Sequence, residues 1–424
     1  MRTFLVALVT CALALTGCTA SKPPSADGFR TLAVSEYRQR MVAGWLGQMI
    51  GVGYGGPTEF SSLGRIIPEE DLPRYHHRLV NNSFGQDDLY VEMTFLRTLQ
   101  EHGLGVSAEQ AGLDFANSRY RLWFGNLAAR DNLRDGIAPP DSGHPSYNEH
   151  PDAIDFQIEA DFAGLISPGM PQQALAVGDR FGRMIGYGDG LYGGLFMACL
   201  YSEAFFIDEP PALVEAGLAC IPPESQYAEA VRDVVGWWRA DPDDWQKTWR
   251  LVDEKYHLDP DYRRVSSTLE GQPAFNIDAK LNGAYVVMGL LFGDRDPMRT
   301  MQVAMRSGQD SDCNPASAAG VLLTALDDRD LTAALLAELD RHEHWEWTDY
   351  DFDGLVAASE ALARESVLAA GGRIERDGAG AEYFLIPVQA ATPGALERSW
   401  APGPAAGSRF SADELAQITV GGRD

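Results

Sequence analysis

The chain has 424 residues and carries 34 Lys and Arg against 61 Asp and Glu, a formal net charge of −27. The sequence contains no cluster of basic residues, and this excludes a surface that neutralises nucleic-acid phosphates. The hydrophobic fraction of 45% excludes a disordered chain and predicts a large packed core.

The first residues have the order of a secretory signal. Arg2 precedes an apolar run over residues 4–15, which is too short to span a membrane as a mature helix. The run ends in Leu15-Thr16-Gly17-Cys18, which resembles a bacterial lipobox. The resemblance implies a signal peptide over 1–17, lipidation of Cys18, export to the cell envelope and no membrane contact except this lipid. An ordinary signal peptide that happens to contain Cys18 is the alternative. Residues 18–30 are expected to be a tether.

Helical spacing of apolar residues dominates the rest of the chain. It predicts helices over residues 34–50, 89–99, 191–206, 227–238, 243–256, 277–292, 298–306 and 316–326. Residues 131–151 lack periodicity and are expected to form a long loop. Strand-like composition occurs only at 382–388, after a glycine-rich turn. We therefore predict an all-α catalytic domain over 31–370, a compact multi-helix bundle, and a C-terminal appendage over 371–424 that contains one β-hairpin.

The cysteines do not resemble a disulfide framework. Apart from Cys11 in the signal peptide and Cys18 at the lipid site, only Cys199, Cys220 and Cys313 remain, an odd number at wide spacing. No CxxC pair is present, which excludes a cysteine-rich zinc site. We expect no disulfide framework.

Two glycine-rich segments match the GxGxxG sequence of dinucleotide-binding loops. They are Gly51-Val52-Gly53-Tyr54-Gly55-Gly56 and Gly188-Asp189-Gly190-Leu191-Tyr192-Gly193. Both follow helical patterns, whereas that fingerprint needs a preceding strand. We do not expect a dinucleotide site.

Two acidic clusters carry the chemistry. Gly85-Gln86-Asp87-Asp88 and Gly308-Gln309-Asp310-Ser311-Asp312-Cys313-Asn314 each stand directly before a predicted helix. Either cluster alone is typical of helix capping. Four carboxylates brought together would repel, and divalent ions such as Mg²⁺ would neutralise them and could clamp a diol and a water. A single ion or calcium is the alternative.

These segments resemble the ADP-ribosylglycohydrolase family, and in particular members that are similar to dinitrogenase-reductase-activating glycohydrolase. Residues 51–60, which include Glu59, are similar to its early glycine-rich motif. Gln86-Asp87-Asp88 resembles its Thr-Asp-Asp motif. Gly308-Gln309-Asp310-Ser311-Asp312-Cys313 resembles its Gly-Asp-x-Asp-Thr motif.

The resemblance implies an all-α hydrolase with two Mg²⁺ ions that cleaves an N- or O-glycosidic bond of a ribosyl or furanosyl substrate. The implied metal ligands are Gln86, Asp87, Asp88, Asp310 and Asp312. Glu59 would assist catalysis beside the anomeric carbon, and Asp310 or Asp312 would orient the attacking water as a general base.

The sequence also departs from the family pattern. Cys313 replaces a threonine, and a thiol is a poor ligand for a hard ion. It is not expected to be a nucleophile, since neighbouring carboxylates oppose a thiolate. The acidic stretch over residues 155–161 stands where the family has a segment that contacts the nucleotide. Gly188-Asp189-Gly190 stands where the family has a Thr-His pair. We expect a sugar-hydroxyl site built from Asp155, Gln157, Glu159, Asp161 and Asp189.

Several alternatives stay open. The acidic stretch over residues 155–161 is also typical of a solvated helix face. An ADP-ribosyl substrate and an extracellular furanoside both fit the chemistry. A non-catalytic sugar- or metal-binding lipoprotein on the same fold is the second reading. A scaffold whose acids only cap helices is the third.

Overall fold

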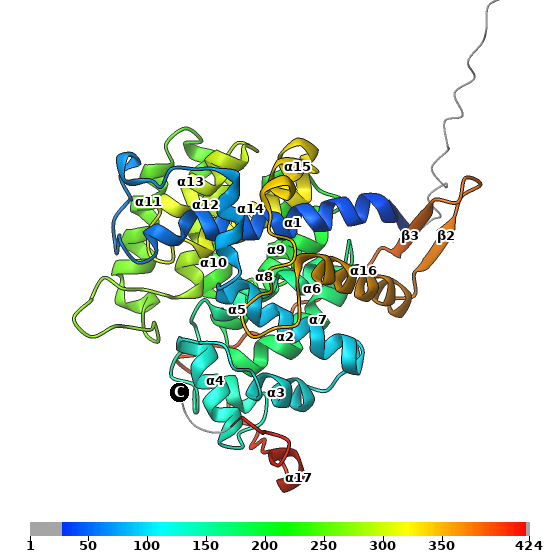
Figure 1. Cartoon of the computed structure of the whole chain (residues 1–424). Helices are drawn as coiled ribbons and strands as arrows, with labels where there is room; N and C mark the ends of the chain where they lie inside the picture. Colours follow the sequence, from blue (N-terminus) through cyan, green and yellow to red (C-terminus); the bar gives the residue numbers. More distant parts are fainter. Residues whose placement is uncertain (1–27, 421–424) are drawn as a thin grey trace, which may run out of the picture.

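The computed structural model describes residues 28–420, and within them helices dominate (Figure 1). The expected all-α class with a small hairpin is confirmed. The signal peptide, Cys18 and most of the tether lie outside the described residues. The helices are α1 Val34–Gly55, α2 Asp87–His102, α3 Ala108–Ala116, α4 Phe124–Arg134, α5 Asp155–Ile158, α6 Asp161–Leu165, α7 Pro171–Ile185, α8 Asp189–Ala204, α9 Pro210–Leu218, α10 Gln226–Ala240, α11 Trp245–Val252, α12 Ala279–Phe292, α13 Pro297–Arg306, α14 Cys313–Leu326, α15 Arg329–Glu338, α16 Phe352–Ala369 and α17 Ala412–Leu415.

The centre of the molecule consists of helices that are buried on all sides. Every residue of α8 and α12 is buried, as is every residue of α14 except Leu326. Their sequences are apolar or small around the whole circumference, which is the pattern of a helix with no solvent face. None of the helices in the described part is long and apolar enough to cross a membrane.

Helix α1 lies unusually close to α14 because glycines line its contact face. A Cβ added at Gly47 would lie 2.5 Å from the carbonyl oxygen of Ala319, and one at Gly51 would lie 2.5 Å from the Cα of Ala316. Four-residue spacing places these glycines on one face of the helix. This close approach is the structural role of the glycine-rich motif, which lies in the last turns of a helix and not in the turn between a strand and a helix that a dinucleotide fold requires.

The sheet joins the two ends of the described chain. Its strands are β1 Phe29–Ala33, β2 Arg373–Arg376 and β3 Glu382–Pro387, in the order β1-β3-β2 with both pairings antiparallel. The β2–β3 hairpin confirms the expectation. Strand β1 was not expected, and Phe29 and Arg30 belong to it rather than to a tether. The other domain bounds stay predictions.

The segment after β3 runs back across the body as an extended strap. Ser399 donates a hydrogen bond to Asp152, and Asp141 accepts three from the backbone N–H groups of Ala406, Gly407 and Ser408. Helix α17 follows the strap and lies beside α3 and α4, far from the hairpin (Figure 1). The strap therefore fastens the predicted loop over 131–151, whose first four residues belong to α4.

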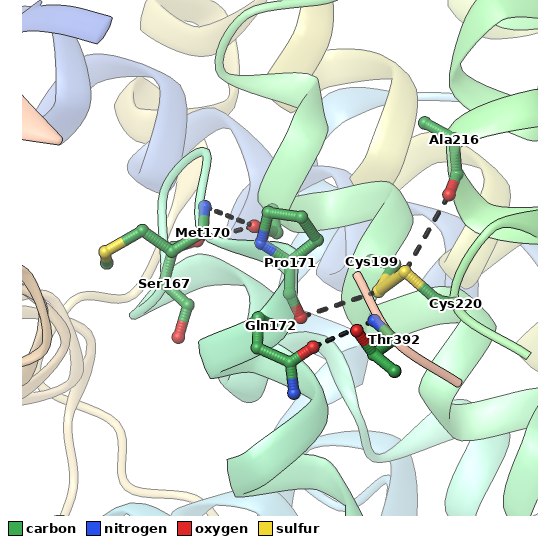
Figure 2. The surroundings of a disulfide bond; sticks show 9 residues. Ser167, Met170, Pro171, Gln172, Cys199, Ala216, Cys220 and Thr392 are labelled. Carbon is green, nitrogen blue, oxygen red and sulfur yellow. Dashed lines mark hydrogen bonds between the residues drawn. A yellow bond between two sulfur atoms is a disulfide. The ribbon is translucent and has the colours of Figure 1, made fainter. Parts of the chain in front are cut away.

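One disulfide corrects the cysteine prediction. Cys199 in α8 is bonded to Cys220, which follows α9, and Cys313 stays free and buried. Figure 2 shows this bridge close to the start of α7, where Gln172 accepts a hydrogen bond from the backbone of Thr392 at 2.8 Å. The odd cysteine count concealed the pair, because the third cysteine lies in another part of the fold.

Candidate functional site

Three chain segments meet at the predicted site. Helix α1 ends at Gly55, and Glu59 follows after one short turn. Helix α2 begins at Asp87, and α14 begins at Cys313, directly after Asp312. Neither Gln86 nor Asp312, the two N-cap residues, makes a side-chain capping hydrogen bond. These side chains are therefore not used as helix caps, which was their simplest alternative role.

The glycine face of α1 also sets the position of the second acidic turn. A Cβ at Gly55 would lie 2.4 Å from the Cα of Asp312 and 2.4 Å from the carbonyl oxygen of Ser311. Two hydrogen bonds add to this contact: Phe60 N–H donates to the Gln309 carbonyl at 3.1 Å, and the Thr58 and Ser311 hydroxyls lie 2.9 Å apart. The loop that carries Glu59 is thus fastened to the turn that carries Asp310 and Asp312.

We call Glu59, Asp87, Asp88, Asp310 and Asp312 the acidic cluster. Ligand atoms of Asp310, Asp312 and Cys313 all lie within 4.8 Å of one another. The Cys313 thiol donates to Asp88 Oδ1 at 3.2 Å, which connects the two acidic turns. The structure therefore brings together the residues that the sequence assigned to metal binding and catalysis.

Burial raises the pKa of every member of this cluster, and repulsion from neighbouring carboxylates adds to the shift at Glu59, Asp87, Asp88 and Asp310. Burial, followed by Asp312 and Asp87, raises the pKa of Glu59 to about 8. Burial, followed by Asp312, raises the pKa of Asp87 to about 7. The pKa values of Asp88 and Asp310 are raised well above the usual range by burial first and by neighbouring carboxylates second. Such crowded carboxylates need either protons or cations.

The donor set fits a hard divalent cation. It consists of buried carboxylate oxygens and the Gln86 amide, the ligand types that Mg²⁺ and Ca²⁺ prefer. Asp88 Oδ2 is buried and has no hydrogen-bond partner within the described residues. A buried carboxylate oxygen without a partner is costly, and a cation would satisfy it.

Cys313 does not have the properties of a nucleophile. Burial, followed by Asp310 and Asp312, raises the pKa of its thiol well above the usual value. A protonated thiol is a weak nucleophile and a poor ligand for a hard ion. Its observed role is the hydrogen bond to Asp88.

A cavity of about 410 Å³ opens beside the acidic cluster. Glu59, Gln86, Asp87, Asp310 and Cys313 are among the residues that line it. Four aromatic residues that sequence reasoning missed also line it, and we call them the aromatic wall: Phe60, Trp123, Phe124 and Phe275. Phe275 contacts both Phe60 and Phe124, with ring centroids 5.2 and 5.4 Å apart.

The aromatic wall gave no signal in the sequence because its residues come from separate loops. Phe60 and Phe124 have φ values of 49° and 35°, a region that bulky residues rarely adopt. Gln309, beside Asp310, has φ of 56°. Backbone strain of this kind gathers at functional sites more often than elsewhere.

Only one residue of the predicted sugar-binding stretch lines the cavity. Asp155 does so, and it accepts hydrogen bonds from the N–H groups of Gly125 and Asn126 at 3.2 and 2.9 Å. Gln157, Glu159 and Asp161 are fully buried behind it, in or next to α5 and α6. The alternative of a solvated helix face is wrong, because all four side chains are buried.

Asp189 belongs to a different cluster. It lies at the start of α8, accepts a hydrogen bond from Tyr227 N–H at 3.1 Å, and lies 3.9 Å from the buried Lys280 ammonium. Lys280 also pairs with Asp278. Asp189 is not among the residues that line the cavity, so its predicted contact with the sugar has no support in this geometry.

Comparisons with known proteins identify the family of the chain. A family profile described as ADP-ribosylglycohydrolase matches residues 33–406 of the chain. A solved structure described as an ADP-ribosylglycohydrolase-related protein complex is 17% identical and covers 78% of this chain and 99% of that one, with a TM-score of 0.48. No curated protein sequence matches the chain.

Proposed function

Since the chain belongs to the ADP-ribosylglycohydrolase family, a family of hydrolases, we propose that it is a Mg²⁺-dependent hydrolase of an N- or O-glycosidic bond to ribose or a ribose-like furanose. The observation that carries the proposal is the acidic cluster. Five carboxylates from three chain segments meet around Asp88, Asp310 and Asp312, which are buried, and neighbouring acids raise the pKa of Glu59, Asp87, Asp88 and Asp310.

Gln86, Asp87, Asp88, Asp310 and Asp312 are the residues that would hold the ions. Bound Mg²⁺ would supply positive charge that orients a sugar diol and makes a water more acidic. Asp310 or Asp312 would take the proton of the attacking water as general base. Glu59 would place negative charge beside an anomeric carbon that becomes oxocarbenium-like in the transition state.

The aromatic wall has a separate task in this proposal. Its rings line the same cavity as Glu59, Asp87 and Asp310 and would offer an apolar surface for the leaving group. They also keep water from the far side of the sugar, which strengthens the charge interactions at the acidic cluster. The sugar ring would lie between the two.

We also propose that the protein is exported and attached to the cell envelope through Cys18. The support comes from the lipobox-like sequence and from the Cys199–Cys220 disulfide, since disulfides persist in oxidising compartments. An extracytoplasmic location favours furanosides of that compartment as substrates over intracellular ADP-ribosylated proteins.

Turnover with and without metal tests the function. The purified protein is supplied with ADP-ribosyl-arginine and with aryl ribofuranosides and arabinofuranosides, in Mg²⁺ or in EDTA. We expect hydrolysis of at least one substrate in Mg²⁺ only, and a loss of at least about 100-fold in Asp310→Asn. Asp330→Asn, an exposed acid on α15, is the matched control. Full turnover in EDTA or in Asp310→Asn would contradict the proposal, and binding without turnover would favour the non-catalytic alternative.

A further inference from the structure

A second hollow continues the cavity away from the acidic cluster. This groove of about 470 Å³ shares Arg121 and Trp123 with the cavity and extends past Arg119 to Glu346 and Trp347. We call it the arginine groove. A ligand that fills the cavity and is longer than one ring would enter it next.

One wall of the arginine groove is an extended segment with alternating exposure. Arg119, Arg121 and Trp123 are exposed, whereas Tyr120 and Leu122 between them are buried. Alternation with a period of two places the three exposed side chains on one face. The Arg121 guanidinium lies over the Trp123 ring, 4.8 Å from its centroid.

Buried hydrogen bonds hold this segment rigidly. The Tyr90 hydroxyl donates to the Arg121 carbonyl at 2.6 Å, and Arg130 donates to the Tyr120 carbonyl at 2.7 Å. Tyr90 lies in α2, in the turn after Asp87. The wall is therefore built onto the same helix that presents part of the acidic cluster, and its exposed side chains are displayed from a fixed backbone.

An exposed tryptophan from another part of the chain also lines the groove. Trp345 is buried against Phe84, and Glu346 N–H donates to the Phe84 carbonyl at 3.0 Å. Trp347 follows with 62% of its surface exposed and with φ of 59°. A large apolar side chain that is both exposed and in a strained conformation has no role in packing, and it points to a role in binding.

The charge of the arginine groove is opposite to that of the chain. Three of its nine lining residues are arginines and one is a glutamate. The whole chain has 34 basic residues against 61 acidic ones. Arg130 is buried and donates hydrogen bonds to the Tyr120 carbonyl and the Ser118 hydroxyl. The Arg119 side chain makes no hydrogen bond, ion pair or ring contact within residues 28–420. The arginine groove is thus a positively charged surface next to the cavity, and it favours an anionic group.

We propose that the arginine groove is a second substrate subsite that binds an anionic group attached to a ring, in the part of the substrate beyond the sugar held at the acidic cluster. The inference that the bound molecule is a substrate rests on the proposed function. Guanidinium groups recognise phosphate and carboxylate oxygens, and indole rings stack on planar rings or on sugar faces. The acidic cluster binds the diol end, and the arginine groove binds the anion end.

Calorimetric binding with paired probes tests the subsite. AMP is compared with adenosine, and a glucuronic-acid disaccharide with the matching glucose disaccharide, all in Mg²⁺. We expect one anionic probe to bind at least about tenfold more tightly than its neutral partner and to lose this advantage in Arg119→Gln. The pair that shows the preference tells whether the anion is a phosphate or a carboxylate. Equal binding within both pairs would overturn the proposal.

Two further variants separate binding from folding. Trp347→Gly removes the indole, and glycine adopts a positive φ without strain, so the variant should unfold at the same or higher urea concentration while the anionic probe binds less tightly. Arg299→Gln, an exposed arginine on α13, should change nothing. Equal weakening in Arg299→Gln would mean a general charge effect and would overturn the subsite. These binding results do not depend on turnover, so a failure of the proposed hydrolysis would be seen separately in the turnover assay.

Discussion

Replacing Gly55 by alanine tests how the fold positions the second acidic turn. The new Cβ would lie 2.4 Å from two backbone atoms, the Cα of Asp312 and the carbonyl oxygen of Ser311, where ordinary contact begins at 3.4 Å. Neither atom can rotate away, so α14 must move by about 1 Å. Such overpacking costs about 1–3 kcal/mol, against a helix-propensity gain of about 1 kcal/mol.

The effect on the site should exceed the effect on stability. A shift of about 1 Å in reacting groups costs about 100-fold in rate. We therefore expect Gly55→Ala to lose up to about 2 kcal/mol in urea unfolding and to bind Mg²⁺ at least about tenfold more weakly in calorimetry.

Gly236→Ala is the matched control for this prediction. Gly236 lies exposed in α10, and no atom lies within 4 Å of its added Cβ. The same substitution there should raise stability by about 0.5–1 kcal/mol and leave Mg²⁺ binding unchanged. The packing explanation would be refuted if Gly55→Ala behaved like Gly236→Ala.

Three further predictions concern the cysteines and a histidine. Cys220→Ser should lower stability by about 3 kcal/mol, since the disulfide closes a loop with a sequence separation of 21; unchanged urea unfolding would contradict the bond. Cys313→Thr should raise Mg²⁺ affinity about tenfold by replacing a soft sulfur beside Asp88 with a hydroxyl, and equal affinities in calorimetry would contradict this. Burial, followed by Arg263, lowers the pKa of His257 from 6.5 to about 4. The folded state therefore binds fewer protons, so the contribution of His257 to stability is complete above pH 6.5 and falls as the pH drops towards 4. The loss is up to about 3 kcal/mol for this buried side chain, and it should be absent in His257→Gln when urea unfolding is compared at pH 4 and 7.

Periodicity predicted the helices well where the apolar stripe was long. The helix expected over 34–50 is α1, and the helix expected over 277–292 is α12. Strand β1 was not predicted because its five residues show no strand pattern of their own. Its partner β3 lies near the other end of the chain. Local patterns cannot report such a distant pairing.

The acidic turns could be found from the sequence because each is a short run with distinctive spacing. The two acidic turns meet because glycines line one face of α1. The sequence contained these glycines but did not reveal this role. The stretch from Asp155 to Asp161 was misplaced for a different reason. Acids at this spacing are usually solvated, and only the tertiary structure shows that these are buried.

The aromatic wall and the arginine groove were invisible to sequence reasoning. Their residues come from chain segments that are far apart in the sequence, and their exposed faces are defined by backbone conformations rather than by spacing. Trp123 and Trp347 are distant in the sequence and line the same groove. The positive φ value of Trp347 and the exposure of Arg119 and Arg121 became evident only in three dimensions.

Titration of Mg²⁺ into the protein, followed by calorimetry, tests the central claim most directly. The account predicts saturable binding in the wild type, strong weakening in Asp88→Asn and in Asp312→Ala, and unchanged binding in Asp330→Asn. The wild type should also unfold at a higher urea concentration when Mg²⁺ is present. Absence of Mg²⁺ binding in the wild type, or equal binding in all four proteins, would contradict the assignment of the acidic cluster as the metal centre.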